Sequence, residues 1–269
     1  MIELPTERSV VTNYNPKLLI LMGRPKQGKS SLVASIDDNL IIDLEDGYRA
    51  LSVMKVQARS MKDLEEIRAA IIAKGKEIKK APYRFITIDN ATRLEEMSLP
   101  VAADMYRNTA MGQGYGLLKD AKGLPLRDPK TGKTVIDPKA DVRTLPNGAG
   151  YTYLRKALRN MIDMFKPLCE TLILVTHVKD KQIRKDGQEM SEMAVDLAGK
   201  SADIICGEAD AIGLVYRDGN KTYVSFEGGD NTIKEARCPH LRGKKILVAE
   251  SNENNEVEFN TSEIFINKQ

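Results

Sequence analysis

The sequence that decides the fold is LLILMGRPKQGKSSLVASI, residues 18–36. It begins with the apolar run LLILM and continues into GRPKQGKS, which matches the glycine, four residues, glycine, lysine and serine pattern of a phosphate-binding loop. Residues 31–36 can then begin a helix, whose first amides and dipole favour a bound phosphate. A strand, a glycine-rich loop and a helix in this order predict a site for a nucleoside triphosphate.

The residues of the loop are suited to different parts of such a ligand. Gly23 and Gly28 allow a close backbone approach that a side chain would prevent. Lys29 is expected to lie along the β and γ phosphates, and the hydroxyl of Ser30 to coordinate Mg²⁺, which prefers oxygen ligands. We therefore expect ATP and Mg²⁺ as cofactors. The residues expected to hold the phosphates are Gly23, Arg24, Pro25, Lys26, Gln27, Gly28, Lys29, Ser30 and Ser31.

Short apolar runs alternate with longer segments of helical period along the chain, a pattern typical of a parallel sheet flanked by helices. One helix is indicated after Ser60, with Asp63 three residues on as in a capping box, and another ends before Pro167. Turn residues at 218–220 predict a hairpin, and thus antiparallel strands at the C-terminal end. We expect an α/β fold, a mainly parallel sheet with helices on both faces. The predicted strands are residues 18–22, 40–44, 85–88, 172–176 and 211–216.

Two regions interrupt this alternation. Residues 107–150 carry many glycines and prolines with Lys and Arg between them, and this segment is too long for an ordinary connection. It is expected to be a mobile lid or a binding loop. Residues 251–269 are polar, and they form either a docked tail or an edge strand. The predicted organisation is an N-terminal arm at 1–16, one domain at 17–250 with the insertion 107–150, and the tail at 251–269.

Charge and cysteine content exclude several classes of protein. The chain has 41 Lys and Arg against 38 Asp and Glu, so its net charge of +3 is too small for a globally basic nucleic-acid binder. The three cysteines, Cys169, Cys206 and Cys238, are far apart, and the chain has only two histidines. This argues against a disulfide framework and a zinc site, and Cys238 with His240 is interpreted as structural.

The apolar runs are also too short for a membrane protein. None approaches the roughly 20 residues that span a bilayer. The first ten residues, MIELPTERSV, lack the basic segment followed by an apolar one that marks a secretory signal. We therefore expect a cytoplasmic protein, in a reducing compartment, with no membrane partner.

Two acidic residues at predicted strand ends are candidates for the chemistry. Asp89 follows the apolar run FITI and is expected to face the water shell of Mg²⁺, although it could also only cap the next helix. The next residue is Asn90, so a base that activates water must come from elsewhere. We favour Glu45, at the end of the second strand, over Glu95 or Glu96, because ligands of parallel sheets bind at the C-terminal ends of strands.

The order GRPKQGKS, IIDLEDG, FITIDN and LILVTH resembles the core of RecA-type P-loop ATPases. The segments VTHVKDK and LAGKSAD, together with a late arginine, are similar to the phage RecA-like single-strand annealing ATPases. The resemblance covers about residues 17–247 and implies a RecA-like NTPase core. It implies that Glu45 activates water, that His177 senses the γ phosphate, and that Arg237 reaches into a neighbouring subunit's site. The sequence departs from that pattern at Glu235, where a lysine is expected.

The resemblance also implies a partner. Four cations directly after the sensor match the position of a DNA-contacting loop, although such a charged run could also be an ordinary solvated loop. The implied function is ATP hydrolysis linked to single-stranded DNA in phage-type recombination or annealing, by a homo-oligomer in ring or filament form, with a single-strand DNA-binding protein as a further partner. The four cations are Lys179, Lys181, Arg184 and Lys185.

Two other functions fit the same loop. One is a monomeric phosphotransferase, in which residues 107–150 close as a lid and Arg127 or Arg143 clamps the transferred group. The other is a non-hydrolysing assembly protein, in which ATP only orders an interface.

Overall fold

One sheet organises the computed structural model, which describes residue 6 and residues 15–137, 139–185, 188–229, 233–254 and 257–267. Its strands are β1 (Leu18–Met22), β2 (Asn39–Asp43), β3 (Lys55–Gln57), β4 (Phe85–Asp89), β5 (Thr171–Thr176), β8 (Ala211–Asp218), β9 (Lys221–Ser225), β10 (Glu235–Ala236), β11 (Lys245–Ser251) and β12 (Val257–Phe259). The helices are α1 (Lys29–Ala34), α2 (Met61–Ile78), α3 (Ala91–Arg107), α4 (Gly150–Phe165) and α5 (Ser201–Glu208). Short 3₁₀ turns lie at Val142–Thr144, Pro146–Gly148 and Lys166–Leu168.

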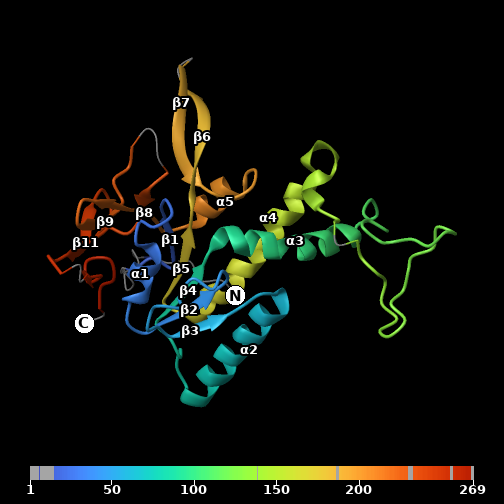
Figure 1. Ribbon diagram of the computed structural model, residues 1–269, viewed down its shortest axis with the longest axis horizontal. Coiled ribbons are helices and arrows are strands. Elements are labelled where there is room, and N and C mark those ends of the chain that lie inside the picture. The colour runs from blue at the N-terminus through green and yellow to red at the C-terminus, as the bar shows by residue number, and fades with distance from the viewer. Residues whose placement is uncertain are drawn as a thin grey trace.

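The central part of the sheet is parallel, in the order β8-β1-β5-β4-β2-β3. Strand β5 lies between β1 and β4, with Met22 opposite Thr176 and Asp89 opposite Val175. The C-terminal ends of these three strands therefore meet at one edge of the sheet. On the β8 side, β9, β11 and β12 continue the sheet with antiparallel pairing (Figure 1). The predicted fold class, with antiparallel strands at the C-terminal end, is confirmed.

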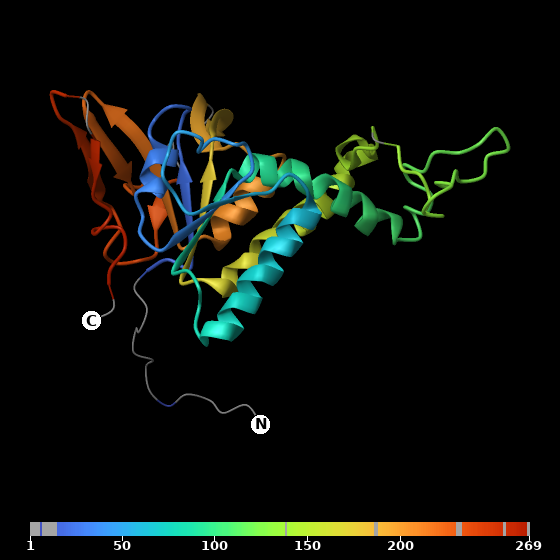
Figure 2. The same ribbon diagram turned by 60° about the horizontal axis from the view of Figure 1, so that its bottom comes forward.

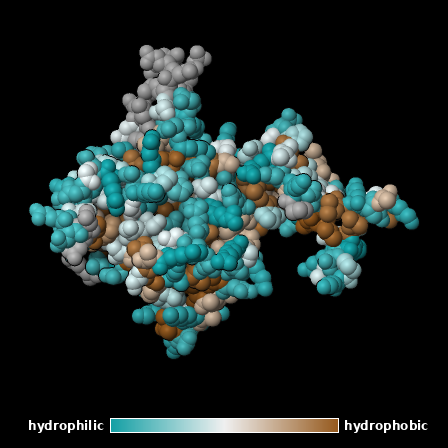
Figure 3. Space-filling model, in the orientation of Figure 1, coloured by the Kyte–Doolittle hydropathy of each residue, from teal (hydrophilic) through white to brown (hydrophobic). Residues whose placement is uncertain are grey.

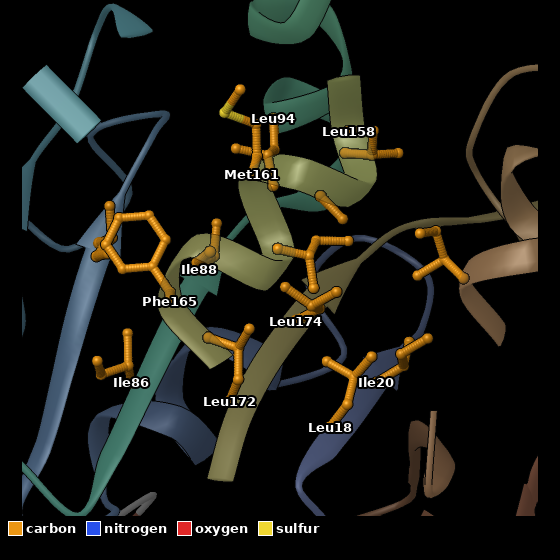
Figure 4. Close-up of a cluster of buried hydrophobic side chains, with 14 of the residues drawn as sticks. Leu18, Ile20, Ile86, Ile88, Leu94, Leu158, Met161, Phe165, Leu172 and Leu174 are labelled. Carbon is orange, nitrogen blue, oxygen red and sulfur yellow. The ribbon is translucent and has the colours of Figure 1, made fainter. Parts of the chain in front are cut away.

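Both faces of the central strands are covered, which explains why they are apolar without alternation. On one face, Leu172 and Leu174 of β5 pack in the same cluster as Leu158 and Phe165 of α4 (Figure 4). Helices α2, α3 and α5 contribute to that cluster. The opposite face packs against α1 and against Phe265 near the C-terminus. Helices thus lie on both faces, as the sequence predicts.

The predicted helix boundaries follow from local chemistry. Ser60 caps α2 and accepts a hydrogen bond from the backbone N–H of Asp63, whose side chain bonds back to Ser60 N, so the predicted capping box is present. Helix α4 ends at Phe165, before Pro167. No helix in the described part of the chain is long and apolar enough to cross a membrane.

The charged segment after His177 is a hairpin, and the prediction of a loop there is wrong. Strands β6 (Val178–Lys185) and β7 (Gln188–Val195) pair antiparallel in a two-stranded sheet of their own, which projects from the C-terminal end of β5 (Figure 1). Strand β6, with the sequence VKDKQIRK, carries charged residues at consecutive positions, so no apolar alternation marks it as a strand.

The insertion forms an arm, defined here as residues 108–149, between α3 and α4. It extends away from the sheet in both views (Figures 1 and 2). Three backbone hydrogen bonds close a ring within it: Leu118 N donates to Val135 O (3.0 Å), Val135 N to Leu126 O (2.8 Å), and Leu126 N to Leu118 O (2.8 Å). Hydrophobic side chains gather on its surface (Figure 3), among them Leu124, which is 60% exposed. The arm therefore has a backbone scaffold of its own.

The predicted tail is both a docked segment and an edge strand. Strand β12 pairs with β11 at the edge of the sheet. Beyond it, Phe265 is buried with its ring centroid 4.5 Å from that of Phe85. Most of the predicted N-terminal arm, residues 1–16, lies outside the described residues; Asn15 donates to Ile266 O (2.8 Å).

The core assignment predicts a large difference between two leucines. Leu174 in β5 is 1% exposed, and Leu174→Ala should lower the free energy of unfolding by about 3 kcal/mol through lost burial and a residual cavity. Leu124→Ala, the matched change on the arm, should alter it by less than about 0.5 kcal/mol. Urea unfolding of both variants measures the difference. Equal losses of unfolding free energy would contradict the assignment, because they would show that Leu124 of the arm is packed as well as Leu174 of β5.

Candidate functional site

The C-terminal ends of the parallel strands border a cleft of about 270 Å³. It brings together the glycine-rich loop, the ends of β2, β4 and β5, and one residue of β8. Of the residues predicted to hold phosphates, Gly23, Arg24 and Gln27 do not line it. Its lining residues are Pro25, Lys26, Gly28, Lys29, Ser30, Ser31, Asp43, Glu45, Gly47, Tyr48, Asp89, His177 and Arg217.

The loop needs its two glycines for different reasons. A Cβ on Gly23 would lie 2.5 Å from the carbonyl oxygen of Val215 in β8, so only glycine fits against that strand. Gly28 adopts φ of +92°, in the left-handed region that side chains disfavour, directly before α1 begins at Lys29. The close approach of β8 and the turn into α1 together fix the path of the loop.

Lys29 lies inside this loop and is 6% exposed. Its Nζ donates to Gly23 O (2.7 Å) and to Arg24 O (2.8 Å). Burial lowers the pKa of Lys29, while the charges of Asp89 and Glu45 act in the opposite direction. The ammonium group of Lys29 thus shares the cleft with the carboxylates of Asp89 and Glu45.

Asp89 at the end of β4 is joined to the loop by hydrogen bonds. Ser30 Oγ donates to Asp89 Oδ2 (3.0 Å), and the hydroxyl of Tyr48 donates to the same oxygen. Burial raises the pKa of Asp89, and the hydrogen bonds from Tyr48 and Ser30 oppose that rise. Burial, and then the charge of Asp89, raises the pKa of Tyr48, so its hydroxyl stays a donor.

The oxygens of Ser30 and Asp89 form a donor set suited to Mg²⁺. Both are hard ligands, and Mg²⁺ is usually held by one or two carboxylates together with substrate phosphates. Among the residues that the structure describes, no group of three or more His, Cys, Asp and Glu side chains could hold a metal ion alone. The residues therefore fit a metal that binds together with a nucleotide.

Glu45 follows β2 and is carried into the cleft by a turn. Asp43 Oδ1 accepts hydrogen bonds from the backbone N–H of Glu45 (3.1 Å) and of Gly47 (3.2 Å), and so shapes that turn. Glu45 itself is exposed and lines the cleft. Asp43 is opposite Asp89 in the register of β2 and β4, which brings the two strand ends side by side.

The alternative bases lie elsewhere. Glu95 in α3 is buried, and its Oε2 accepts a hydrogen bond from Ala198 N (2.8 Å). Glu96 pairs with Arg93 at 2.6 Å. Neither residue lines the cleft, whereas Glu45 does.

His177, the predicted sensor, lies at the junction of β5 and β6 and lines the cleft. Its Nδ1 is buried and has no hydrogen-bond partner among the described residues. Its backbone carbonyl accepts from Asp196 N (3.0 Å), which ties the start of the hairpin to the segment after β7. The ring thus stands between the cleft and the hairpin.

The hairpin cations that the structure describes have acidic partners. Lys179 donates to Leu197 O and lies 3.6 Å from Asp196. Lys181 lies 3.3 Å from Asp203. Arg184 and Lys185 belong to β6, but their side chains lie outside the described residues.

Arg237, the predicted inter-subunit arginine, lies at the opposite edge of the sheet from the loop. Its N–H donates to Asp210 O (2.7 Å), and its Nη2 to Gly207 O (2.6 Å). Asp210 in turn accepts from the backbone N–H of Lys17 and Leu18, at the start of β1. Arg237 therefore does not line the cleft of its own chain, and its action on a neighbour stays a prediction.

The arm does not lie over the cleft. None of its described residues lines that cavity. Arg127 donates to Gly132 O (3.1 Å), and Arg143 pairs with Asp141 at 2.5 Å, both within the arm. The structure thus gives no support to a phosphoryl clamp built from these arginines.

Four residues of the cleft were not predicted from the sequence: Asp43, Gly47, Tyr48 and Arg217. Tyr48 and Asp43 flank Glu45 in IIDLEDGY, so the strand-end argument that selected Glu45 could have found them. Arg217, near the end of β8, reaches the cleft because β8 pairs with β1. Sheet order is not readable from the sequence, and no local signal marks Arg217.

Comparison with known proteins agrees with this geometry. A family model described as an AAA domain matches residues 15–123 and 129–253. The unmatched residues 124–128 fall within the arm. A search of curated proteins finds no match. Because the family match includes the glycine-rich loop, every strand end of the cleft and most of the chain, the protein belongs to the AAA domain family of P-loop ATPase domains.

Proposed function

We propose that this protein binds ATP with Mg²⁺ in the cleft and hydrolyses it. The observation that carries the proposal is the contact between Ser30 Oγ and Asp89 Oδ2 (3.0 Å), with Lys29 and Glu45 in the same cavity. These residues supply the parts that phosphoryl transfer to water requires: a phosphate-binding cation, oxygen ligands for a metal, and a carboxylate base.

Each residue has a separate role in the proposal. Lys29 binds the β and γ phosphates, and Ser30 and Asp89 hold the metal, which when bound supplies positive charge beside those phosphates. Glu45 accepts the proton of the attacking water, since it is exposed within the cleft and free to reach it. His177 reports loss of the γ phosphate to the hairpin that it adjoins.

We further propose that single-stranded DNA is the partner, in recombination or annealing, and that the protein self-associates. The hairpin supports this, because it starts at His177 and because Arg24 of the loop lies 4.0 Å from Asp180 of β6. The phosphates of bound DNA would replace Asp196 as the partner of Lys179 and Asp203 as the partner of Lys181. Arg237 lies far from the glycine-rich loop of its own chain, and this position fits a role at the nucleotide site of a neighbouring subunit.

Lys29→Ala should abolish ATP binding and leave the fold intact, because the ammonium group serves the phosphates and its hydrogen bonds among the described residues go only to carbonyls of the loop. Calorimetric titration with Mg²⁺-ATP measures the affinity, and circular dichroism checks the fold. Lys62→Ala, which removes an exposed lysine from α2, is the matched control and should bind as the parent does. A folded Lys29→Ala protein with parental affinity would refute the loop assignment.

Glu45→Gln should keep ATP binding and lower turnover by about 10²-fold or more, the scale of a lost general base. Release of inorganic phosphate at saturating ATP is the measurement. Glu96→Gln makes the same change outside the cleft and should keep the parental rate. If Glu96→Gln or Glu95→Gln is the inactive variant instead, the base is not Glu45.

Replacing Lys179, Lys181, Arg184 and Lys185 together by Ala should weaken binding of single-stranded DNA of any sequence. Each lost phosphate contact should reduce the slope of log affinity against log salt by about 0.7. Fluorescence anisotropy over a salt series gives that slope.

The arm provides the matched control for the hairpin variant. Its lysines have no ion pair among the described residues, and four of them form the control set: Lys119, Lys122, Lys130 and Lys133. Changing these four to Ala removes the same charge, and under the proposal it should leave the slope unchanged. A reduced slope in the arm variant, with a parental slope in the hairpin variant, would move the DNA site to the arm.

A further inference from the structure

Arg217 lies on the opposite side of the loop from the carboxylates of the cleft. Sheet order fixes this, because β8 neighbours β1 on one side, whereas β5, β4 and β2 follow on the other. Asp89 and Glu45 come from the ends of β4 and β2, and Arg217 comes from β8. The cleft therefore has an acidic end and a cationic end, with the glycine-rich loop between them.

The contacts of Arg217 hold it beside the loop. Its backbone N–H donates to Gln27 Oε1 (2.7 Å). Its Nε and Nη2 lie 3.7 Å from the position that a Cβ on Gly28 would occupy, and Thr222, its partner on β9, lies 3.6 Å from the same position. The β8–β9 hairpin thus packs the guanidinium against the second glycine of the loop.

The guanidinium has no competing partner in the described part of the chain. No ion pair or side-chain hydrogen bond involves it there, and the residue is exposed and lines the cleft. Arg237, in contrast, is bonded to Gly207. A planar guanidinium with unused donors, next to a phosphate-binding loop, is suited to hold a phosphate oxygen through charge-assisted hydrogen bonds.

The two ends of the cleft give a bound nucleotide a direction. The γ phosphate must lie toward Ser30, Asp89 and Glu45, where the metal ligands and the base are. The phosphates run along the loop, so the α phosphate and the nucleoside lie toward β8. Arg217 then stands at the α end, away from the bond that breaks.

We propose that Arg217 binds the α phosphate of a nucleotide held in the cleft of its own chain. The proposal rests on the proposed nucleotide site and adds a contact that ATP and ADP share. Arg217 therefore contributes equally to the affinity for both nucleotides and does not contribute to cleavage of the γ phosphate.

The test is calorimetric titration of Mg²⁺-ATP and Mg²⁺-ADP into the full chain and its Arg217→Ala variant. Both affinities should fall by the same factor, about 10-fold or more, as expected for loss of a hydrogen bond to a charged group. Turnover at saturating ATP should stay at the parental rate. Arg217→Lys keeps the charge but loses the planar fork, and its affinities should lie between those of the parent and the Ala variant.

Lys221→Ala is the matched control. Lys221 is on the β8–β9 hairpin, as Arg217 is, and lies 3.7 Å from Glu250. It does not line the cleft, so Lys221→Ala removes one positive charge without changing the site. This control should bind both nucleotides as the parent does.

Two results would overturn the inference. Unchanged affinities in Arg217→Ala would show that the guanidinium does not contact the nucleotide. A loss confined to ATP, or a fall in turnover at saturation, would place it at the γ phosphate. In both cases the parent still binds nucleotide; a parent that binds neither ATP nor ADP would instead refute the proposed function.

Discussion

One oxygen, Oδ2 of Asp89, connects the parts of the cleft. It accepts hydrogen bonds from Ser30, at the start of α1, and from Tyr48, after the turn that carries Glu45. Because β5 separates β1 from β4, no backbone pairing joins the loop strand to the strand of Asp89. Side chains that reach over the end of β5 must make that link. The two donors also oppose the effect of burial, which nevertheless raises the pKa of Asp89.

The fold could be predicted because its central strands are buried on both faces. LLILM is apolar throughout and FITI is interrupted only by Thr87, and strand ends in a parallel sheet collect at one edge, so Lys29, Asp89 and Glu45 could be placed near one another. The capping pair Ser60 and Asp63 marked a helix start directly, since the signal is local in sequence.

The rest depended on contacts that no local pattern records. Strand β6 of the hairpin after His177 carries charges at consecutive positions, so its sequence shows no apolar alternation that would mark a strand. Arg217 enters the cleft only because β8 is the second neighbour of β1, and the order of strands is a property of the folded chain. Tyr48 is buried in the same cluster as Leu32 and Val33 of α1, with its hydroxyl bonded to Asp89, and an isolated tyrosine after a turn carries no sign of such a partner.

We propose that this cleft hydrolyses ATP and that single-stranded DNA, as the partner of the chain, speeds that hydrolysis. The most direct test is the release of inorganic phosphate from Mg²⁺-ATP by the full chain, measured with and without single-stranded DNA alongside its mass in solution. We expect slow release alone, faster release with DNA, and a mass above that of one chain. Transfer of the phosphoryl group to an acceptor other than water, or a change of mass with ATP but no hydrolysis, would contradict this proposal.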